Sequence, residues 1–212
     1  MRALIIGASG ATGKDLVQVM LNNPDYTEVI AFVRRPAELK HPKLKQVITD
    51  FDRLEDVSSE IKGDVWFSCL GTTLKAAGSK DKQWLIDYEI PMAFAHIAKR
   101  NGVPKAILLS AYGASPKSNV FYSKMKGELE EGISKMGFDQ YVIFRPGLLL
   151  RKDTDRFAEK MSAGVLKFLN GIGLIKRFKP LPTELLAKKL AKAPEKLALG
   201  KHIIELEQIF EF

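Results

Sequence analysis

The chain has 212 residues, which suits one domain of ordinary size, and 46% of them are hydrophobic, which is enough for a sizeable core. Its formal net charge is +8, but no long run of like charges occurs. The excess therefore predicts a solvated basic surface that suits an anionic small molecule, and it argues against nucleic-acid binding. The single cysteine, Cys69, excludes an intrachain disulfide, and the histidines (His41, His96 and His202) lack metal-ligand spacing, so no metal site is expected.

Short apolar runs without alternation, typical of strands buried on both faces of a sheet, recur along the chain. In chain order they lie at residues 3–6, 28–33, 45–49, 64–70, 105–110, 140–144 and 202–206. Helical spacing of apolar residues predicts helices between them, at residues 14–22, 84–100, 120–136 and 183–192. Pro91 is expected to kink the second helix or delay its start, Gly137 to end the third, and Thr183 to be the N-cap of the fourth.

This alternation of strands and helices predicts an α/β fold: a doubly wound parallel Rossmann-type sheet of six to seven strands, with helices on both faces. No repeat or linker divides the chain, so residues 1–212 are expected to form one domain. The least regular stretch, residues 151–182, is basic and contains glycines and two prolines. It predicts a small C-terminal lobe on the substrate side of that domain.

The N-terminal segment does not have the form of a signal peptide, because the apolar run at residues 1–6 is short and a glycine-rich loop follows at once. No apolar stretch approaches the roughly 20 residues that a membrane-spanning helix needs. Together with the lone cysteine, these features predict a soluble, cytoplasmic protein without an integral membrane segment.

A glycine-rich loop lies between the first predicted strand and the first predicted helix, the context that dinucleotide binding requires. Its residues are Gly7, Ala8, Ser9, Gly10, Ala11, Thr12 and Gly13. Glycines in this pattern permit the sharp turn, the approach of a pyrophosphate and close helix packing, while the helix N-terminus attracts the phosphates. The residues therefore predict a dinucleotide site in one NAD(P)-binding domain; the alternative is a glycine turn with a packing role only.

Two arginines, Arg34 and Arg35, follow the second predicted strand, roughly 20 residues beyond the loop, where an NAD-binding protein places Asp or Glu against the ribose 2′-hydroxyl. A guanidinium suits a 2′-phosphate instead, because it pairs bidentately with phosphate oxygens. The cofactor is therefore predicted to be NADP (NADPH), unless the two arginines are ordinary surface residues.

Other cofactor contacts are expected where the third and fourth strands end, since these ends line the ligand crevice of a doubly wound sheet. Asp50, followed by Phe51, could accept from the adenine amino group, or it could simply be a turn residue. Cys69, Leu70, Gly71 and Thr72 end the fourth strand. Gly71 would allow close approach of a ribose, while Cys69 is interpreted as a small buried apolar residue and not as a nucleophile.

The predicted helix 120–136 contains a Y-x-x-x-K element, Tyr122 and Lys126, whose spacing places both side chains on one helix face. The lysine ammonium favours the phenolate form of the tyrosine, which could then act as a general acid during hydride transfer. Ser110, at the end of the fifth strand, could hold the same substrate oxygen. The element is common by chance, and only its place downstream of a glycine loop points to catalysis.

Several segments together resemble the short-chain dehydrogenase/reductase superfamily: GASGATG at 7–13, LLSAYGAS at 108–115, YSKMK at 122–126 and FRPGLLL at 144–150. Others resemble its atypical branch, which includes the Tat-interacting-protein-like NADPH-binding proteins: CLGTT at 69–73, the helix 84–100 with Asp87 and Tyr88, and SNVFYSKMKGELE at 118–130.

This resemblance implies a Rossmann-type sheet that binds NADP. It also implies that Tyr122 is the proton donor, that Lys126 binds the nicotinamide ribose, that Ser110 orients the substrate and that Pro146 lies near the nicotinamide. The chain departs from many relatives in two places. Ala111 stands where they have a second serine, for which Ser115 is the nearest substitute, and Asp87 stands where they have asparagine.

The function predicted from these features is an NADP-dependent oxidoreductase that transfers hydride to or from a carbonyl or alcohol, a small molecule of unknown identity, with Tyr122 as general acid/base. The alternative is an NADP-sensing regulatory protein with little or no turnover, whose state a protein partner reads. A weaker alternative is a sugar-nucleotide epimerase or dehydratase, which usually needs a larger substrate domain than this chain offers.

Overall fold

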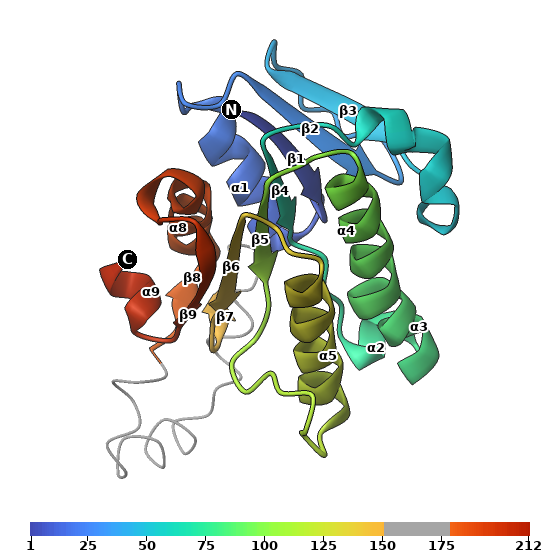
Figure 1. Cartoon of the computed structure of the whole chain (residues 1–212), viewed down its shortest axis with the longest axis vertical. Helices are drawn as coiled ribbons and strands as arrows, with labels where there is room; N and C mark the ends of the chain where they lie inside the picture. The colour runs from blue at the N-terminus through green and yellow to red at the C-terminus, as the bar shows by residue number, and fades with distance from the viewer. Residues whose placement is uncertain (151–178) are drawn as a thin grey trace.

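The protein is described by a computed structural model that covers residues 1–150 and 179–212 (Figure 1). Almost all of the predicted lobe at residues 151–182 lies outside this described part. Seven parallel strands form the central sheet in the order β3-β2-β1-β4-β5-β6-β9, with helices on both faces. The predicted fold class, sheet type and strand number are therefore confirmed.

The strands of the sheet are β1 (Arg2–Ile6), β2 (Glu28–Val33), β3 (Leu44–Ile48), β4 (Val65–Ser68), β5 (Lys105–Leu109), β6 (Gln140–Arg145) and β9 (Gly200–Glu205). The helices are α1 (Ala11–Leu21), the 3-10 helix η1 (Phe51–Glu60), α2 (Leu74–Ala77), α3 (Lys80–Trp84), the π-helical turn η2 (Leu85–Glu89), α4 (Ile90–Arg100), α5 (Phe121–Lys135), α8 (Thr183–Lys196) and α9 (Gln208–Glu211). A separate two-stranded sheet pairs β7 (Leu149–Leu150) with β8 (Leu181–Pro182).

The strand order reverses direction between β1 and β4. The chain builds outward from β1 to β3, then returns to the other side of β1 and continues outward to β9. Because Ile6 pairs with both Phe32 and Ser68, the carboxyl ends of β2, β1 and β4 are level with one another. Such a reversal opens a crevice beyond the strand ends, which is where ligands bind in sheets of this kind.

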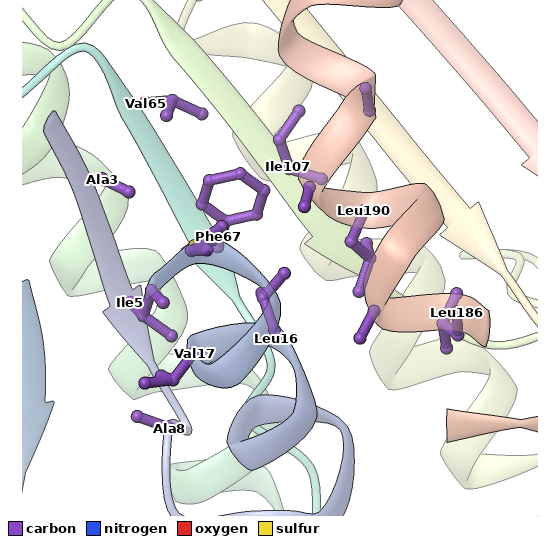
Figure 2. Packing of buried hydrophobic residues seen from close by; sticks show 14 of the residues in the cluster. Ala3, Ile5, Ala8, Leu16, Val17, Val65, Phe67, Ile107, Leu186 and Leu190 are labelled. Atoms are coloured by element: carbon purple, nitrogen blue, oxygen red, sulfur yellow. The ribbon is translucent and has the colours of Figure 1, made fainter. Parts of the chain in front are cut away.

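Each face of the sheet has its own hydrophobic core, because successive strand residues point to opposite faces. Ala3 and Ile5 of β1 belong to the core beneath α1, α8 and α9, and Figure 2 shows Ile5 and Phe67 near Leu16 of α1. The residues that alternate with them, Leu4 and Ile6, belong to the core beneath η1, α4 and α5. Both sets are apolar, which explains the unbroken hydrophobic runs in the sequence.

The predicted helix 84–100 differs most from the structure. Helical backbone begins earlier, at Lys80, after Ser79 accepts a hydrogen bond from the Lys82 amide at 3.1 Å as the N-cap. It then passes through the π-helical turn η2 before α4 begins at Ile90. Pro91, which lacks an N–H, lies in the first turn of α4, but Glu89 before it is already helical, so the predicted late start at this proline was wrong.

Two smaller predictions were wrong. Thr183 is the first helical residue of α8 and not its N-cap, a position that Pro182 occupies without a side-chain hydrogen bond. The helix η1 was not predicted, although Phe51, Leu54 and Val57 recur at every third residue, because the rest of the segment is polar and Leu54 is its one buried residue. The cap at the end of α5 agrees with the prediction, since Gly137 follows Met136 with φ of +70°.

The α8 helix stabilises the sheet through its buried leucines, among them Leu190, which is 1% exposed and lies opposite Ile107 in Figure 2. We expect Leu190→Ala to lower the free energy of unfolding by about 2–5 kcal/mol, because it leaves a cavity in the core. Leu199 is 69% exposed, so Leu199→Ala should change it by about 0.5 kcal/mol or less. Urea denaturation of both variants measures the difference; equal losses would contradict the assigned packing of α8.

Candidate functional site

The glycine loop packs so closely that two of its positions have no room for a side chain. A Cβ on Gly7 would lie 2.5 Å from the carbonyl carbon of Cys69, and a Cβ on Gly13 would lie 2.1 Å from the Gly7 carbonyl oxygen. Gly7 also has φ of +81°, which favours glycine. These contacts hold the β1–α1 turn against the end of β4.

The same turn presents the N-terminus of α1 to solvent. Gly10 is the N-cap, so the N-cap residue has no side chain to cap the helix, and the first turn contains no acidic residue. The first intrahelical bond from this turn runs from the Lys14 amide to the Gly10 carbonyl at 2.9 Å, so the preceding amides have no helical partner. This arrangement can hold a phosphate group.

A cleft of about 640 Å³ lies at the carboxyl ends of the strands, within the usual size range of small-molecule sites. It joins the glycine loop to the end of β4, the segment of α2 and α3, the end of β5 and the start of α5, elements that lie along one edge of the sheet in Figure 1. Its lining includes ten of the predicted site residues: Gly10, Ala11, Thr12, Cys69, Leu70, Gly71, Thr72, Ser110, Tyr122 and Lys126.

The other predicted cofactor residues lie outside this lining. Ser9 is exposed and Ala8 is buried, and both lie in the loop between Gly7 and Gly10. Pro146 is buried, and its carbonyl accepts a hydrogen bond from the Tyr112 amide at 3.0 Å.

Arg34 and Arg35 follow the carboxyl end of β2 and are exposed. Within residues 1–150 and 179–212 neither guanidinium forms an ion pair. Because β2 is the neighbour of β1 in the sheet, both arginines stand beside the strand that leads into the glycine loop.

Asp50 and Phe51 have local structural contacts at the end of β3. The Asp50 carboxylate accepts a hydrogen bond from the Asp52 amide at 3.1 Å and caps η1, which agrees with its alternative interpretation as a turn residue. The Phe51 side chain is partly buried against the core beneath α4. Neither residue lines the cleft.

Cys69 lines the cleft, but its thiol is not suited to nucleophilic chemistry. Burial raises the pKa of the Cys69 thiol to about 12, because the apolar surroundings disfavour the thiolate. The interpretation of Cys69 as a small apolar residue therefore agrees with its environment.

The predicted pairing of Tyr122 with Lys126 is present on one face of α5. The Lys126 ammonium lies 5.9 Å from the centre of the Tyr122 ring, and both residues line the cleft. Tyr122 is 38% exposed, whereas Lys126 is 2% exposed. The phenol therefore faces the open side of the cleft and the ammonium lies at its floor.

Asp87, whose position was noted only as a departure from related sequences, joins this site. Its carboxylate is fully buried and lies 3.5 Å from the Lys126 ammonium. Both of its oxygens also accept a hydrogen bond from the Thr72 amide, at 3.0 and 3.2 Å. The Gln83 side chain donates a hydrogen bond to the Thr72 carbonyl at 3.1 Å. Asp87 lies in the π-helical turn η2, and π-turns occur frequently at functional sites.

Ser110 is held by a buried carboxylate. Its hydroxyl donates to Glu130 on α5 at 2.5 Å, and Glu130 also accepts two hydrogen bonds from Arg145, at 2.6 and 3.1 Å. Arg145 in turn contacts Glu205 of β9 at 3.3 Å. The Ser110 oxygen is thus within the cleft, but its own proton is engaged by the protein.

The Asp87–Lys126 pair is expected to be important for stability. We predict that Asp87→Ala lowers the free energy of unfolding by about 3–5 kcal/mol, because it leaves Lys126 as a buried charge without its partner. Adding Lys126→Met should recover much of this loss in a double-mutant cycle measured by denaturation.

The matched control is Lys124 with Glu128, a pair on the same helix at 3.8 Å in which the lysine is exposed and the glutamate half-buried. Glu128→Ala should cost about 1 kcal/mol or less. If Asp87→Ala cost no more than this control, the buried pair would not have the role assigned to it.

Comparisons with known proteins place the chain in a family. A family model described as NAD(P)H-binding matches residues 7–165. Among curated relatives, "Protein FMP52, mitochondrial" of Candida albicans is 34% identical over 188 residues, which cover 85% of this chain and 82% of that protein. Protein HTATIP2 of Rattus norvegicus is 36% identical over 150 residues, covering 69% of this chain and 62% of that protein.

Solved structures confirm the fold. A putative NAD-dependent epimerase/dehydratase from Bacillus halodurans has a TM-score of 0.71 at 20% identity, covering 95% of this chain and 92% of that chain. A short-chain dehydrogenase/reductase superfamily protein from Agrobacterium tumefaciens with bound NAD has a TM-score of 0.69 at 15% identity, covering 97% and 77%. At these identities the likeness concerns the fold alone.

The comparisons overturn the prediction of a cytoplasmic location. The FMP52 relatives from Candida albicans, Saccharomyces cerevisiae and Emericella nidulans are all named mitochondrial. The prediction was wrong because a lone cysteine excludes only an intrachain disulfide and does not separate one reducing compartment from another. In the described ranges, none of the helices has the length and apolar character needed to cross a bilayer.

Proposed function

Because the chain belongs to the NAD(P)H-binding family of atypical short-chain dehydrogenases/reductases, in the branch with FMP52 and HTATIP2, we propose that it is an NADP-dependent oxidoreductase. Its reaction is hydride transfer between the nicotinamide and a carbonyl or alcohol carbon. The observation that supports this most is the single cleft that contains the uncapped α1 N-terminus, Tyr122 and Lys126 together.

The residues at the cleft fit a dinucleotide. The crowded glycine turn brings backbone amides to the cleft wall, where they can donate to a pyrophosphate. Gly71 follows the end of β4 and is exposed. Its surroundings are uncrowded, because a Cβ built on it would come no nearer than 3.5 Å to another atom, the Asp87 carboxylate oxygen. The backbone there is therefore open to a ribose. When bound, NADPH supplies the hydride that adds to the carbonyl carbon, and its nicotinamide is oxidised.

Tyr122 then donates its phenolic proton to the carbonyl oxygen, which gives the alcohol, and regains a proton from solvent, to which it is open. Lys126 stabilises the phenolate that forms, since its ammonium lies on the same helix face near the ring. Asp87 fixes the Lys126 ammonium and the Thr72 backbone at the same time. It therefore acts as a positioning residue for both walls of the site.

Tyr122→Phe tests this assignment. We expect the turnover of NADPH with a carbonyl panel to fall by about 10²–10⁴-fold, because the proton donor is lost while the ring remains. NADPH affinity, measured by fluorescence titration, should be nearly unchanged and is the control for folding. Turnover that survives the substitution would refute Tyr122 as the acid.

The preference for NADP is proposed from Arg34 and Arg35, which are exposed beside β1 and have no ion-pair partner in the described part of the chain. Replacing both by alanine should weaken NADPH binding about tenfold or more and leave NADH binding nearly unchanged, because only NADPH carries the 2′-phosphate.

The control is Lys62→Ala. It removes an exposed charge just before β4, at the amino ends of the strands, whereas the two arginines lie at the carboxyl ends. Dissociation constants for both cofactors, measured by calorimetry at one salt concentration, decide the matter. Equal affinities of the unaltered protein for NADPH and NADH would contradict the preference.

One observation favours a second candidate function, an NADP-sensing binding protein with little turnover. Because the Ser110 hydroxyl already donates to Glu130, it does not offer its proton to a substrate oxygen. In that case a protein partner would be recovered in NADPH-dependent amounts, and turnover would be insensitive to Tyr122→Phe. Recovery that does not depend on the cofactor would count against sensing.

A further inference from the structure

Two ammonium groups line the cleft, those of Lys80 and Lys126, and the lining contains no Asp or Glu from the described ranges. The charge of Lys126 is balanced by Asp87, 3.5 Å away. Lys80 has no carboxylate partner among residues 1–150 and 179–212; its contact is with the Phe121 ring, whose centre lies 5.4 Å from the ammonium. The cleft wall thus carries one positive charge that these parts of the chain do not balance.

Lys80 belongs to the part of the cleft where a substrate would lie. Phe121, the residue beneath its ammonium, directly precedes Tyr122 at the start of α5. The α1 N-terminus and the two arginines after β2 are separate elements that can serve the cofactor phosphates. A cation beside Tyr122 is therefore available to another anion.

The surroundings of Lys80 are apolar and open. Leu74 and Val120 line the cleft and are 47% and 62% exposed, and Phe121 and Leu149 line it as well. Large apolar side chains that stay exposed around a concave site are typical of a ligand-binding surface. A ligand that fits this wall has an apolar body.

On the premise of the proposed oxidoreductase function, we infer that the substrate is a carbonyl compound that carries a carboxylate on an apolar body. The carbonyl oxygen meets Tyr122, the apolar body packs against Leu74 and Val120, and the carboxylate pairs with Lys80. The Phe121 ring holds the ammonium in place, so less side-chain freedom is lost when the ion pair forms. The pair joins two opposite charges, an ion pair that a neutral carbonyl compound cannot form.

Calorimetric titration of the protein saturated with NADP⁺ tests this without turnover, because the oxidised cofactor cannot reduce a ketone. The two probes are 4-acetylbenzoate and 4-acetylbenzamide, which differ only in the charge of the group opposite the ketone. We expect about fivefold tighter binding of the benzoate, the upper range for an exposed ion pair. Lys80→Gln should remove this preference and leave binding of the benzamide unchanged.

The matched control is Lys82→Gln, which removes the same charge from the same helix at an exposed residue outside the cleft lining. It should keep the preference. The inference is overturned if the unaltered protein shows no preference or binds neither ketone, if Lys80→Gln keeps the preference, or if both variants lose it equally. It is also overturned if Lys80→Gln weakens NADP⁺ binding instead, since Lys80 would then serve the cofactor.

The proposed function is tested separately, by NADPH turnover. A protein that prefers the benzoate through Lys80 but reduces no carbonyl compound would refute the oxidoreductase activity and leave the anion site in place. A protein that reduces neutral and anionic ketones equally well would refute the anion site and leave the activity in place.

Discussion

At the carboxyl end of β1, the backbone of Gly7 lies directly against the backbone of Cys69 and Leu70, and the Gly7 carbonyl lies directly against Gly13. Because neither glycine position has room for a Cβ, α1 starts close to the sheet at the point where the strand order reverses. This contact aligns the open N-terminus of α1 with the end of β4. The nucleotide end of the cleft depends on it, since a side chain at either position would force the two walls apart.

The other end of the cleft depends on a buried charge. Asp87 is fully enclosed, yet it contacts an ammonium on α5 and an amide at the end of β4. A buried carboxylate is costly unless it is paired and hydrogen-bonded, and here both conditions are met. It therefore links two elements that the sheet alone would leave independent, and it balances the charge of Lys126. Among residues 1–150 and 179–212 Lys80 receives no such balance, which gives the two cations of the cleft different capacities for binding anions.

Much of the fold could be predicted because strands buried on both faces leave an unambiguous apolar run. The run at residues 28–33 became β2 with the same bounds, and the run at 140–144 became β6 with one more residue. The segment η1 was missed because it is short of apolar residues: only Phe51, Leu54 and Val57, three residues apart, face the core, and only Leu54 is buried. The start of α3 was missed because the residues after its N-cap Ser79, Lys80 to Gln83, are all polar and show no apolar spacing.

The sequence by itself determined the glycine turn, the Tyr122–Lys126 spacing and the parallel sheet, because each depends on steric limits and on residues close together in the chain. Only the tertiary structure decided that Asp87 balances Lys126, that Ser110 donates to Glu130 and that Lys80 stands beside Phe121. Those pairs are separated by 39, 20 and 41 residues along the chain, as their residue numbers show. A contact of that kind forms only when separate elements pack, and local sequence patterns contain no record of which partners will meet.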